Sequence, residues 1–178
     1  MENLDNAVTE ATNGSDAAFE TLWRYFYPRL LRYLAMFTKD AEDLCSEVWI
    51  KIAKAIRNFS GDAKAFQGWI FQIARNAATD HARKSKREGA TSELQESDWI
   101  SRDSSMVEVT DLLRRLPKDQ AEVIMLRVIV GMEVELVADI TGKSAANVRV
   151  LSHRGLLELK ESLTISGYSR RKGGAHNE

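Results

Sequence analysis

The stretch with the clearest potential for chemistry runs from Asn58 to Arg87 and combines aromatic residues with a basic ridge. Phe59, Phe66 and Trp69 stand near its beginning, and residues 75–87 contain five basic residues and a single acid. Flat aromatic rings can stack on unpaired bases, and cations can neutralise phosphates. This combination indicates binding of an unstacked nucleic-acid strand.

A loop followed by a long helix is predicted to position these residues, because the apolar residues recur at spacings of three and four. Asn76, Asp80, Arg83 and Arg87 fall on a different side of this helix, and we assign them, together with Lys84, to strand binding. Phe66 and Ile70 could instead be plain core residues, since large apolar side chains at helical spacing are usually buried. Trp69 fits either interpretation.

A second candidate lies near the C-terminal end of the chain. The sequence predicts a short helix from Glu133 to Ile140, a tight turn at 141–143, and a final helix that Ser144 caps and that ends near Leu163. The polar residues expected to contact DNA there are Lys143, Ser144, Asn147, Arg149, His153 and Arg154. A recognition helix in a major groove needs such a mixture of phosphate anchors and base-edge donors.

Ion pairs are the alternative role for the two arginines of this helix. Arg149 could pair with an acid such as Asp139, and Arg154 could pair with Glu158 at i+4.

The remaining periodic segments predict further helices. Ser15 is expected to cap the first of them, and Pro28 to kink it or start a second segment. An amphipathic helix from Asp40 to Ile56, capped by Thr38, carries acids in its first turn, where the helix dipole favours them. Trp49 lies beside its apolar stripe and indicates either a wide core face or an exposed anchor for a partner. Further on, Pro117 opens a helix with Val128 among its inward residues, and Gly131 closes it.

Composition and charge divide the chain into two modules. Its 178 residues are 44% hydrophobic, with two prolines and ten glycines, as expected of a soluble globular chain. The net charge of −1 hides a segregation: residues 21–87 hold thirteen bases and six acids, whereas residues 88–111 hold one base and seven acids. We predict an all-α protein with domains at 1–87 and 106–163, an acidic flexible linker at 88–105 and a tail at 164–178. Within the linker, Trp99 and Ile100 could dock on either module or on a partner.

Other function classes find little support in the sequence. A single cysteine, Cys45, and three scattered histidines make neither an internal disulfide nor a metal site, and no cofactor is expected. Asp80 and His81 are sequence neighbours and point about 100° apart on a helix, so they favour no enzyme activity. No apolar run reaches the roughly 18 residues of a membrane span, and no secretory signal is visible, so we expect a cytoplasmic protein without membrane insertion.

From about Ala18 to Leu163 the chain resembles the extracytoplasmic-function (ECF, group 4) sigma factors of bacterial RNA polymerase. The resemblance rests on residues 40–49 (DAEDLCSEVW), 66–76 (FQGWIFQIARN) with 80–84 (DHARK), and 116–127 (LPKDQAEVIMLR) followed by Gly131-Met, Val148-Arg and Arg154-Gly-Leu. Each piece alone is weakly specific, but they follow one another in the order and over the length of that family.

The resemblance implies roles for these segments. The helix from Asp40 would bind the clamp helices of the largest polymerase subunit through Asp40, Asp43, Leu44, Glu47, Val48 and Trp49. The loop and helix at 58–87 would open and hold the −10 promoter element, and the last helix would read the −35 element. Further implied partners are the flap of the second-largest subunit and an anti-sigma factor.

Two other kinds of binding protein compete with this interpretation. A stand-alone helix-turn-helix transcriptional regulator would explain the C-terminal half but should bind promoter duplex unaided. A protein-only adaptor would explain the amphipathic faces but not the two basic blocks.

Overall fold

A computed structural model of the chain describes the backbone of residues 2–87 and 110–173 and the side chains of 3–87 and 110–162. Every regular element in these ranges is a helix, which confirms the all-α prediction. The chain divides into two compact units, Met1–Met106 and Val107–Glu178. The predicted linker at 88–105, with Trp99 and Ile100, lies outside the described residues.

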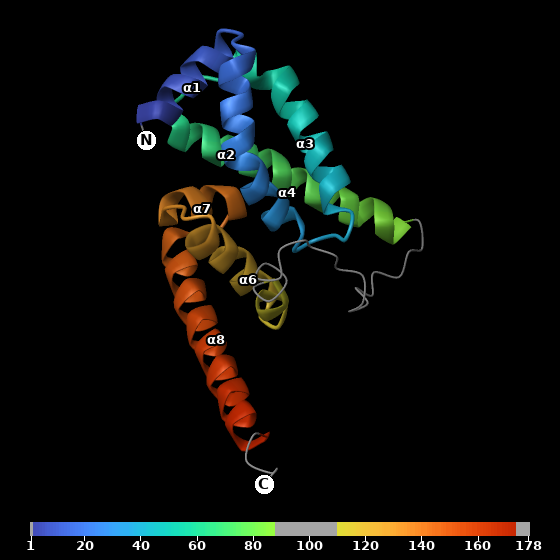
Figure 1. Cartoon of the computed structure of the whole chain (residues 1–178), viewed down its shortest axis with the longest axis vertical. Helices are drawn as coiled ribbons and strands as arrows, with labels where there is room; N and C mark the ends of the chain where they lie inside the picture. The colour runs from blue at the N-terminus through green and yellow to red at the C-terminus, as the bar shows by residue number, and fades with distance from the viewer. Residues whose placement is uncertain (1, 88–109, 174–178) are drawn as a thin grey trace. The chain divides into compact units, whose positions relative to one another are not determined.

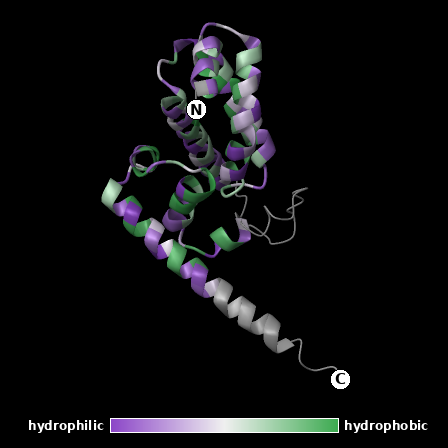
Figure 2. Ribbon diagram, turned by 60° about the vertical axis from the view of Figure 1, so that its left-hand side comes forward, coloured by the Kyte–Doolittle hydropathy of each residue, from purple (hydrophilic) through white to green (hydrophobic). Residues whose placement is uncertain are grey.

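The first unit is a helical bundle that buries one face of each helix. It contains α1 (Glu2–Thr12), α2 (Asp16–Leu34), α3 (Ala41–Ala55), the 3₁₀-helix η1 (Ile56–Asn58) and α4 (Ala63–Arg87) (Figure 1). Fully buried side chains that meet in its centre include Leu22, Phe26 and Leu30 of α2, Val48 and Ile52 of α3, and Phe66, Ile70 and Phe71 of α4. Each such side chain stabilises the unit by roughly 1.5–3 kcal/mol through burial. In Figure 2 hydrophilic and hydrophobic residues alternate along these helices accordingly.

Helix α1 is an element that the sequence prediction missed. Ser15 does cap a helix, since its Oγ accepts a hydrogen bond from the backbone N–H of Ala18, but that helix is the second of the chain. Ala7, Val8 and Ala11 of α1 are buried against its neighbours. Their spacing of one, three and four residues fits one helical face, and from this spacing the helix could have been predicted.

Two other local predictions need correction. Pro28 starts no second segment, because α2 runs unbroken from Asp16 to Leu34 with Pro28 on its exposed side. The buried Phe26 and Leu30 hold the helix against the core on both sides of the proline. Thr38 does not cap α3; the N-cap position is Asp40, and Thr38 Oγ1 accepts a hydrogen bond from the Asp40 backbone N–H.

The second unit begins its described part with a helical turn at 110–114. It continues with α6 (Lys118–Ile124), the π-helix η2 (Met125–Ile129), α7 (Val134–Thr141) and α8 (Ala145–Gly173). Val128 was predicted to face inward but is 52% exposed, since the wider π turn shifts the helical phase. Helix α8 does not end near Leu163 but continues to Gly173, so the predicted tail at 164–178 starts inside a helix.

Close contact between α6 and α8 holds the second unit together. Gly155 of α8 approaches α6 so closely that an added Cβ would lie 2.4 Å from Cδ1 of Ile124. Leu113, Val123, Met125, Leu126 and Val148 are buried around this contact. The small core thereby fixes α8 against α6 and leaves the opposite side of α8 exposed.

Candidate nucleic-acid and protein interfaces

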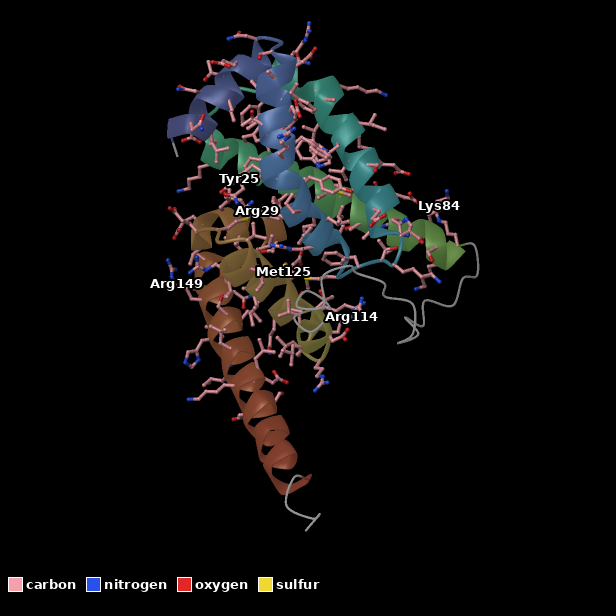
Figure 3. The ribbon with its side chains drawn as sticks, in the orientation of Figure 1. Tyr25, Arg29, Lys84, Arg114, Met125 and Arg149 are labelled. Carbon is pink, nitrogen blue, oxygen red and sulfur yellow. The ribbon has the colours of Figure 1, made fainter. Side chains whose placement is uncertain are left out.

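The exposed side of α4 carries a row of polar residues at helical spacing. Asn76 and Asp80 are both exposed and lie one turn apart, and Gln72, one turn before Asn76, donates a hydrogen bond from Nε2 to Asn76 Oδ1 at 3.3 Å. The row is continued by the basic C-terminal end of α4, where Figure 3 shows Lys84 projecting outward. Amides and carboxylates on such a face can hydrogen-bond to the edges of an unpaired base.

Cations dominate the last turns of α4. Arg83, Lys84, Lys86 and Arg87 are all exposed. The ion pair between Arg83 Nη1 and Asp80 Oδ1 is long, at 3.7 Å, and both side chains are more than 70% exposed. Exposed pairs contribute only about 0–1 kcal/mol, so this pair holds neither side chain firmly. The end of α4 is therefore suited to contacts with phosphates.

At the other end of α4, three aromatic rings form a cluster. The ring centroids of Phe59 and Trp69 lie 5.1 Å apart with their planes 32° from parallel, and both side chains are partly exposed. Phe66 contacts both rings but is fully buried, where it also packs on Phe26. The assignment of Phe66 to DNA binding is therefore wrong, because its ring supports the outer pair from the core. Phe59 and Trp69 keep surface that a base could contact.

Helix α3 presents acids on its exposed side. Asp40, at the N-cap, and Asp43 and Glu47 are exposed, and Ile50 on the same helix is 55% exposed. Figure 1 shows α3 along the border of the first unit, beside α2 and α4. A charged strip with one exposed aliphatic side chain is a surface that a basic partner protein can recognise.

Three residues to which the resemblance assigned a polymerase contact lie in the core. Leu44, Val48 and Trp49 are 4%, 0% and 5% exposed. Trp49 packs its ring edge-on against Phe19 of α2, with ring centroids 5.8 Å apart. The exposed-anchor interpretation of Trp49 is therefore wrong, and the wide-core-face alternative holds. In this structure none of the three side chains can contact a partner.

The second unit contains the predicted helix-turn-helix. Gly142 adopts a left-handed backbone, with φ of 68°, and ends α7. Ser144 then accepts a hydrogen bond from the backbone N–H of Asn147 at 3.2 Å, which confirms it as the cap of α8. Glu133 begins α7 without a side-chain cap. Asn147, Arg149, His153 and Arg154 are all exposed on the first turns of α8, where Figure 3 shows Arg149 projecting.

Two basic residues of this motif are held by acids. Arg149 Nη2 donates to Glu135 Oε1 of α7 at 3.0 Å, so its partner is Glu135 and not Asp139. Lys143 Nζ lies 2.8 Å from Asp119 Oδ2 of α6, and its side chain is only 16% exposed. Lys143 thus fastens the turn to α6, and the DNA contact predicted for it would have to compete with this ion pair. Arg149 is still 59% exposed and can exchange its partner.

Comparison with known proteins matches both units separately. Residues 22–88 match the family model described as Sigma-70 region 2, and residues 106–159 match Sigma-70, region 4. The chain is 28% identical over 183 residues to the ECF RNA polymerase sigma factor SigD of Mycobacterium tuberculosis, covering 93% of this chain and 86% of that protein. It is also 28% identical to the RNA polymerase sigma factor YlaC of Bacillus subtilis, covering 84% and 94%. This chain belongs to the ECF RNA polymerase sigma factors.

Solved structures share the fold of this sigma factor. CnrH, in complex with the cytosolic domain of CnrY, aligns over 92% of this chain and 98% of that one, at 22% identity and a TM-score of 0.67. RpoE of Bartonella quintana, in complex with the anti-sigma factor NepR, covers 83% and 97%, at 23% identity and a TM-score of 0.66. At these identities the likeness concerns the fold.

The region 2 match begins at Leu22 and therefore leaves α1 outside it, although α1 packs against α2, η1 and α4. Among the described residues of the sigma factor, no group of three His, Cys, Asp or Glu could hold a metal ion. The helices described here include none that is both long and apolar enough for a membrane span.

Proposed function

We propose that this sigma factor binds core RNA polymerase, directs it to promoters of a specific regulon, and opens the DNA at the −10 element. Region 2 would supply both the polymerase contact and the strand-holding surface, and region 4 would read the −35 element. The observation that carries the proposal is the exposed side of α4, along which Trp69, the Asn76–Asp80 row and the cationic end follow one another, with Phe59 of the preceding loop packed on Trp69.

Melting would use the two ends of α4 differently. The partly exposed rings of Phe59 and Trp69 offer stacking surface for an unpaired base, which is worth about 1–3 kcal/mol per base. The amides and carboxylate of the middle turns could hydrogen-bond to its edge, and Arg83, Lys84 and Arg87 would hold the phosphates of the same strand. Base contacts give sequence preference, whereas phosphate contacts give affinity that falls with salt.

Core polymerase would bind the exposed acidic strip of α3, formed by Asp40, Asp43 and Glu47. The clamp helices of the largest subunit are the expected partner, and the flap of the second-largest subunit would hold region 4. An anti-sigma factor as inhibitor is consistent with the folds of CnrH and RpoE, which were both solved with a bound protein. These assignments place the protein in the cytoplasm and give it no catalytic role of its own.

For the −35 element, Arg149 and His153 lie one turn apart on α8 and would face the groove, with Asn147 in the first turn and Arg154 at its edge. A bidentate arginine contact to guanine discriminates by about 1–3 kcal/mol. Arg149→Ala should therefore remove discrimination at the base that Arg149 contacts. Substitutions of His153 should change which base is preferred.

Run-off transcription with purified core polymerase on a genomic promoter library, followed by permanganate footprinting, tests the proposal. Specific transcripts and reactive thymines near −10 are expected only when the sigma factor and core polymerase are both present. Tight sequence-specific duplex binding by the chain alone, with no effect of core polymerase, would instead support a stand-alone helix-turn-helix regulator. Failure to bind core polymerase would overturn the proposal.

A further inference from the structure

An acid of α1 holds the first residue of α4. Asp5 Oδ1 accepts a hydrogen bond from the backbone N–H of Ala63 at 2.8 Å, across 58 positions of sequence. Asp62 satisfies a second N–H of the same helix end, that of Ala65, at 2.7 Å. The first N–H groups of a helix have no partner within it, and a carboxylate is a strong acceptor for them. The start of α4 is thus fixed from outside by α1.

The turn after α1 contacts the other side of the same loop. Gly14, with φ of 96°, lies under the guanidinium of Arg57, which belongs to η1 immediately before the loop at 59–62. An added Cβ on Gly14 would lie 3.2 Å from Nη2 of Arg57. Helix α1 and its turn therefore contact the chain just before and just after residues 59–62.

The loop between these two contacts carries part of the aromatic cluster. Phe59 packs on both Trp69 and Phe66, and Gly61 is so crowded that an added Cβ would lie 2.8 Å from the Cβ of Ala65 and 3.1 Å from the Phe59 ring. Gly61 thus lies directly against Ala65 of α4 and the Phe59 ring, so a shift of the start of α4 would move Phe59 relative to Trp69.

We infer that α1 is a positioning element for the −10 site, and that Asp5 is its positioning residue. By holding the N–H of Ala63, Asp5 sets the conformation of residues 59–62 and so the separation of the Phe59 and Trp69 rings. The inference rests on the proposed function of these rings in strand opening. It adds a segment outside the region 2 match, which begins at residue 22, to the residues on which opening depends.

The test compares four holoenzymes reconstituted with the full-length chain, carrying Asp5→Ala, Asp5→Glu, Asp5→Asn or Glu10→Ala. Asp5→Ala removes the acceptor, and Asp5→Glu keeps the charge but displaces the carboxylate by one methylene. Asp5→Asn keeps an acceptor oxygen at the same place. Glu10→Ala is the matched control, since Glu10 is an exposed acid of the same helix. Core-polymerase affinity, the rate of promoter opening and the −10 base preference are measured for each.

Loss of one charge-assisted hydrogen bond should slow opening by about tenfold in Asp5→Ala and by a smaller factor in Asp5→Glu. The −10 preference should broaden in both, whereas their affinity for core polymerase should stay within about twofold of the wild type, because the α3 strip is untouched. Asp5→Asn should restore most of the opening rate, and Glu10→Ala should behave as the wild type.

Wild-type opening rates and an unchanged −10 preference in both Asp5→Ala and Asp5→Glu would overturn the inference. A loss of core-polymerase affinity in parallel with opening would also overturn it, since that result indicates general destabilisation of region 2. If the wild-type holoenzyme itself opens no promoter, the proposed function fails and not the role of α1. In that case two properties of the protein alone would still report whether Asp5 positions the loop. They are the hydrogen-exchange rate of the Ala63 N–H and the contact between the Phe59 and Trp69 rings.

Discussion

Replacing Glu135 by Gln should increase the affinity of the holoenzyme for the −35 element. In the free protein Arg149 donates to Glu135 at 3.0 Å, so base contact by Arg149 first requires that this pair separates. The two side chains are 59% and 66% exposed, and exposed pairs are worth about 0.2–1 kcal/mol. Removing the competitor should therefore tighten binding by about 1.4- to 5-fold.

Salt gives the prediction a second signature. The screening length falls from about 8 Å at physiological ionic strength to about 3 Å at 1 M, so the gain should shrink as salt is raised. Fluorescence anisotropy with holoenzyme and labelled promoter, at several salt concentrations, measures both the gain in affinity and its dependence on salt. Asp139→Asn is the matched control, because Asp139 is an exposed acid one turn further along α7. It removes the same charge without releasing Arg149.

A double-mutant cycle makes the test specific to the pair. In an Arg149→Ala background, Glu135→Gln should bring only the small gain that Asp139→Asn also brings. Equal gains from Glu135→Gln and Asp139→Asn in the wild-type background would show that charge alone matters. An unchanged or weaker affinity of Glu135→Gln would refute the argument that Glu135 competes with DNA for Arg149.

Further outcomes are expected at five residues. Asp43→Lys should weaken core-polymerase binding by about tenfold at unchanged melting temperature, since an exposed charge matters to a complementary interface more than to the fold; an unaltered pull-down would contradict this. Asn76→Ala should slow promoter opening and relax the −10 base preference, which footprinting would show. Arg83→Ala should weaken binding to all sequences evenly and lower the slope of log affinity against log salt by about 0.7–0.9, which salt titrations would show. Gly142→Ala should destabilise region 4 by about 1–2 kcal/mol in urea unfolding, because φ of 68° is unfavourable for a side chain with a Cβ. Burial raises the pKa of the Cys45 thiol to about 12, so iodoacetamide should not modify this thiol in the native protein at pH 8. Between about pH 9 and pH 12 only the unfolded chain ionises the thiol, so the free energy of unfolding should decline over that range.

Local signals in the sequence sufficed to predict most helices and the exposure of the polar residues in the candidate sites. Ser15 and Ser144 cap helices as predicted, and Gly142 supplies the left-handed turn of the helix-turn-helix. Such features depend on the hydrogen-bonding groups of residues within one turn of the chain, so their positions can be predicted without knowledge of the packing. The exposure of Asn76 and Asp80 followed in the same way from helical periodicity.

Tertiary packing decided which apolar residues remain available for partners. Phe66 and Trp69 share one predicted helical face, yet Phe66 is fully buried on Phe26 while Trp69 keeps exposed surface. Trp49 is covered by Phe19 of a different helix. Periodicity gives the direction of a side chain around its own helix, but burial depends on whether a second helix covers that direction. The π turn that exposes Val128 likewise departs from the regular helical phase that periodicity assumes.

The sequence by itself therefore determined the all-α class, the exposure of the polar residues in the candidate sites and the helix-turn-helix of this sigma factor. Only the tertiary structure showed that Asp119 holds Lys143, that Glu135 holds Arg149, and that Asp5 caps α4 from 58 positions away. The physical reason is that caps and periodicity are properties of a few consecutive residues. An ion pair or hydrogen bond between helices requires two backbones to bring donor and acceptor within about 3 Å, and no local pattern encodes that distance.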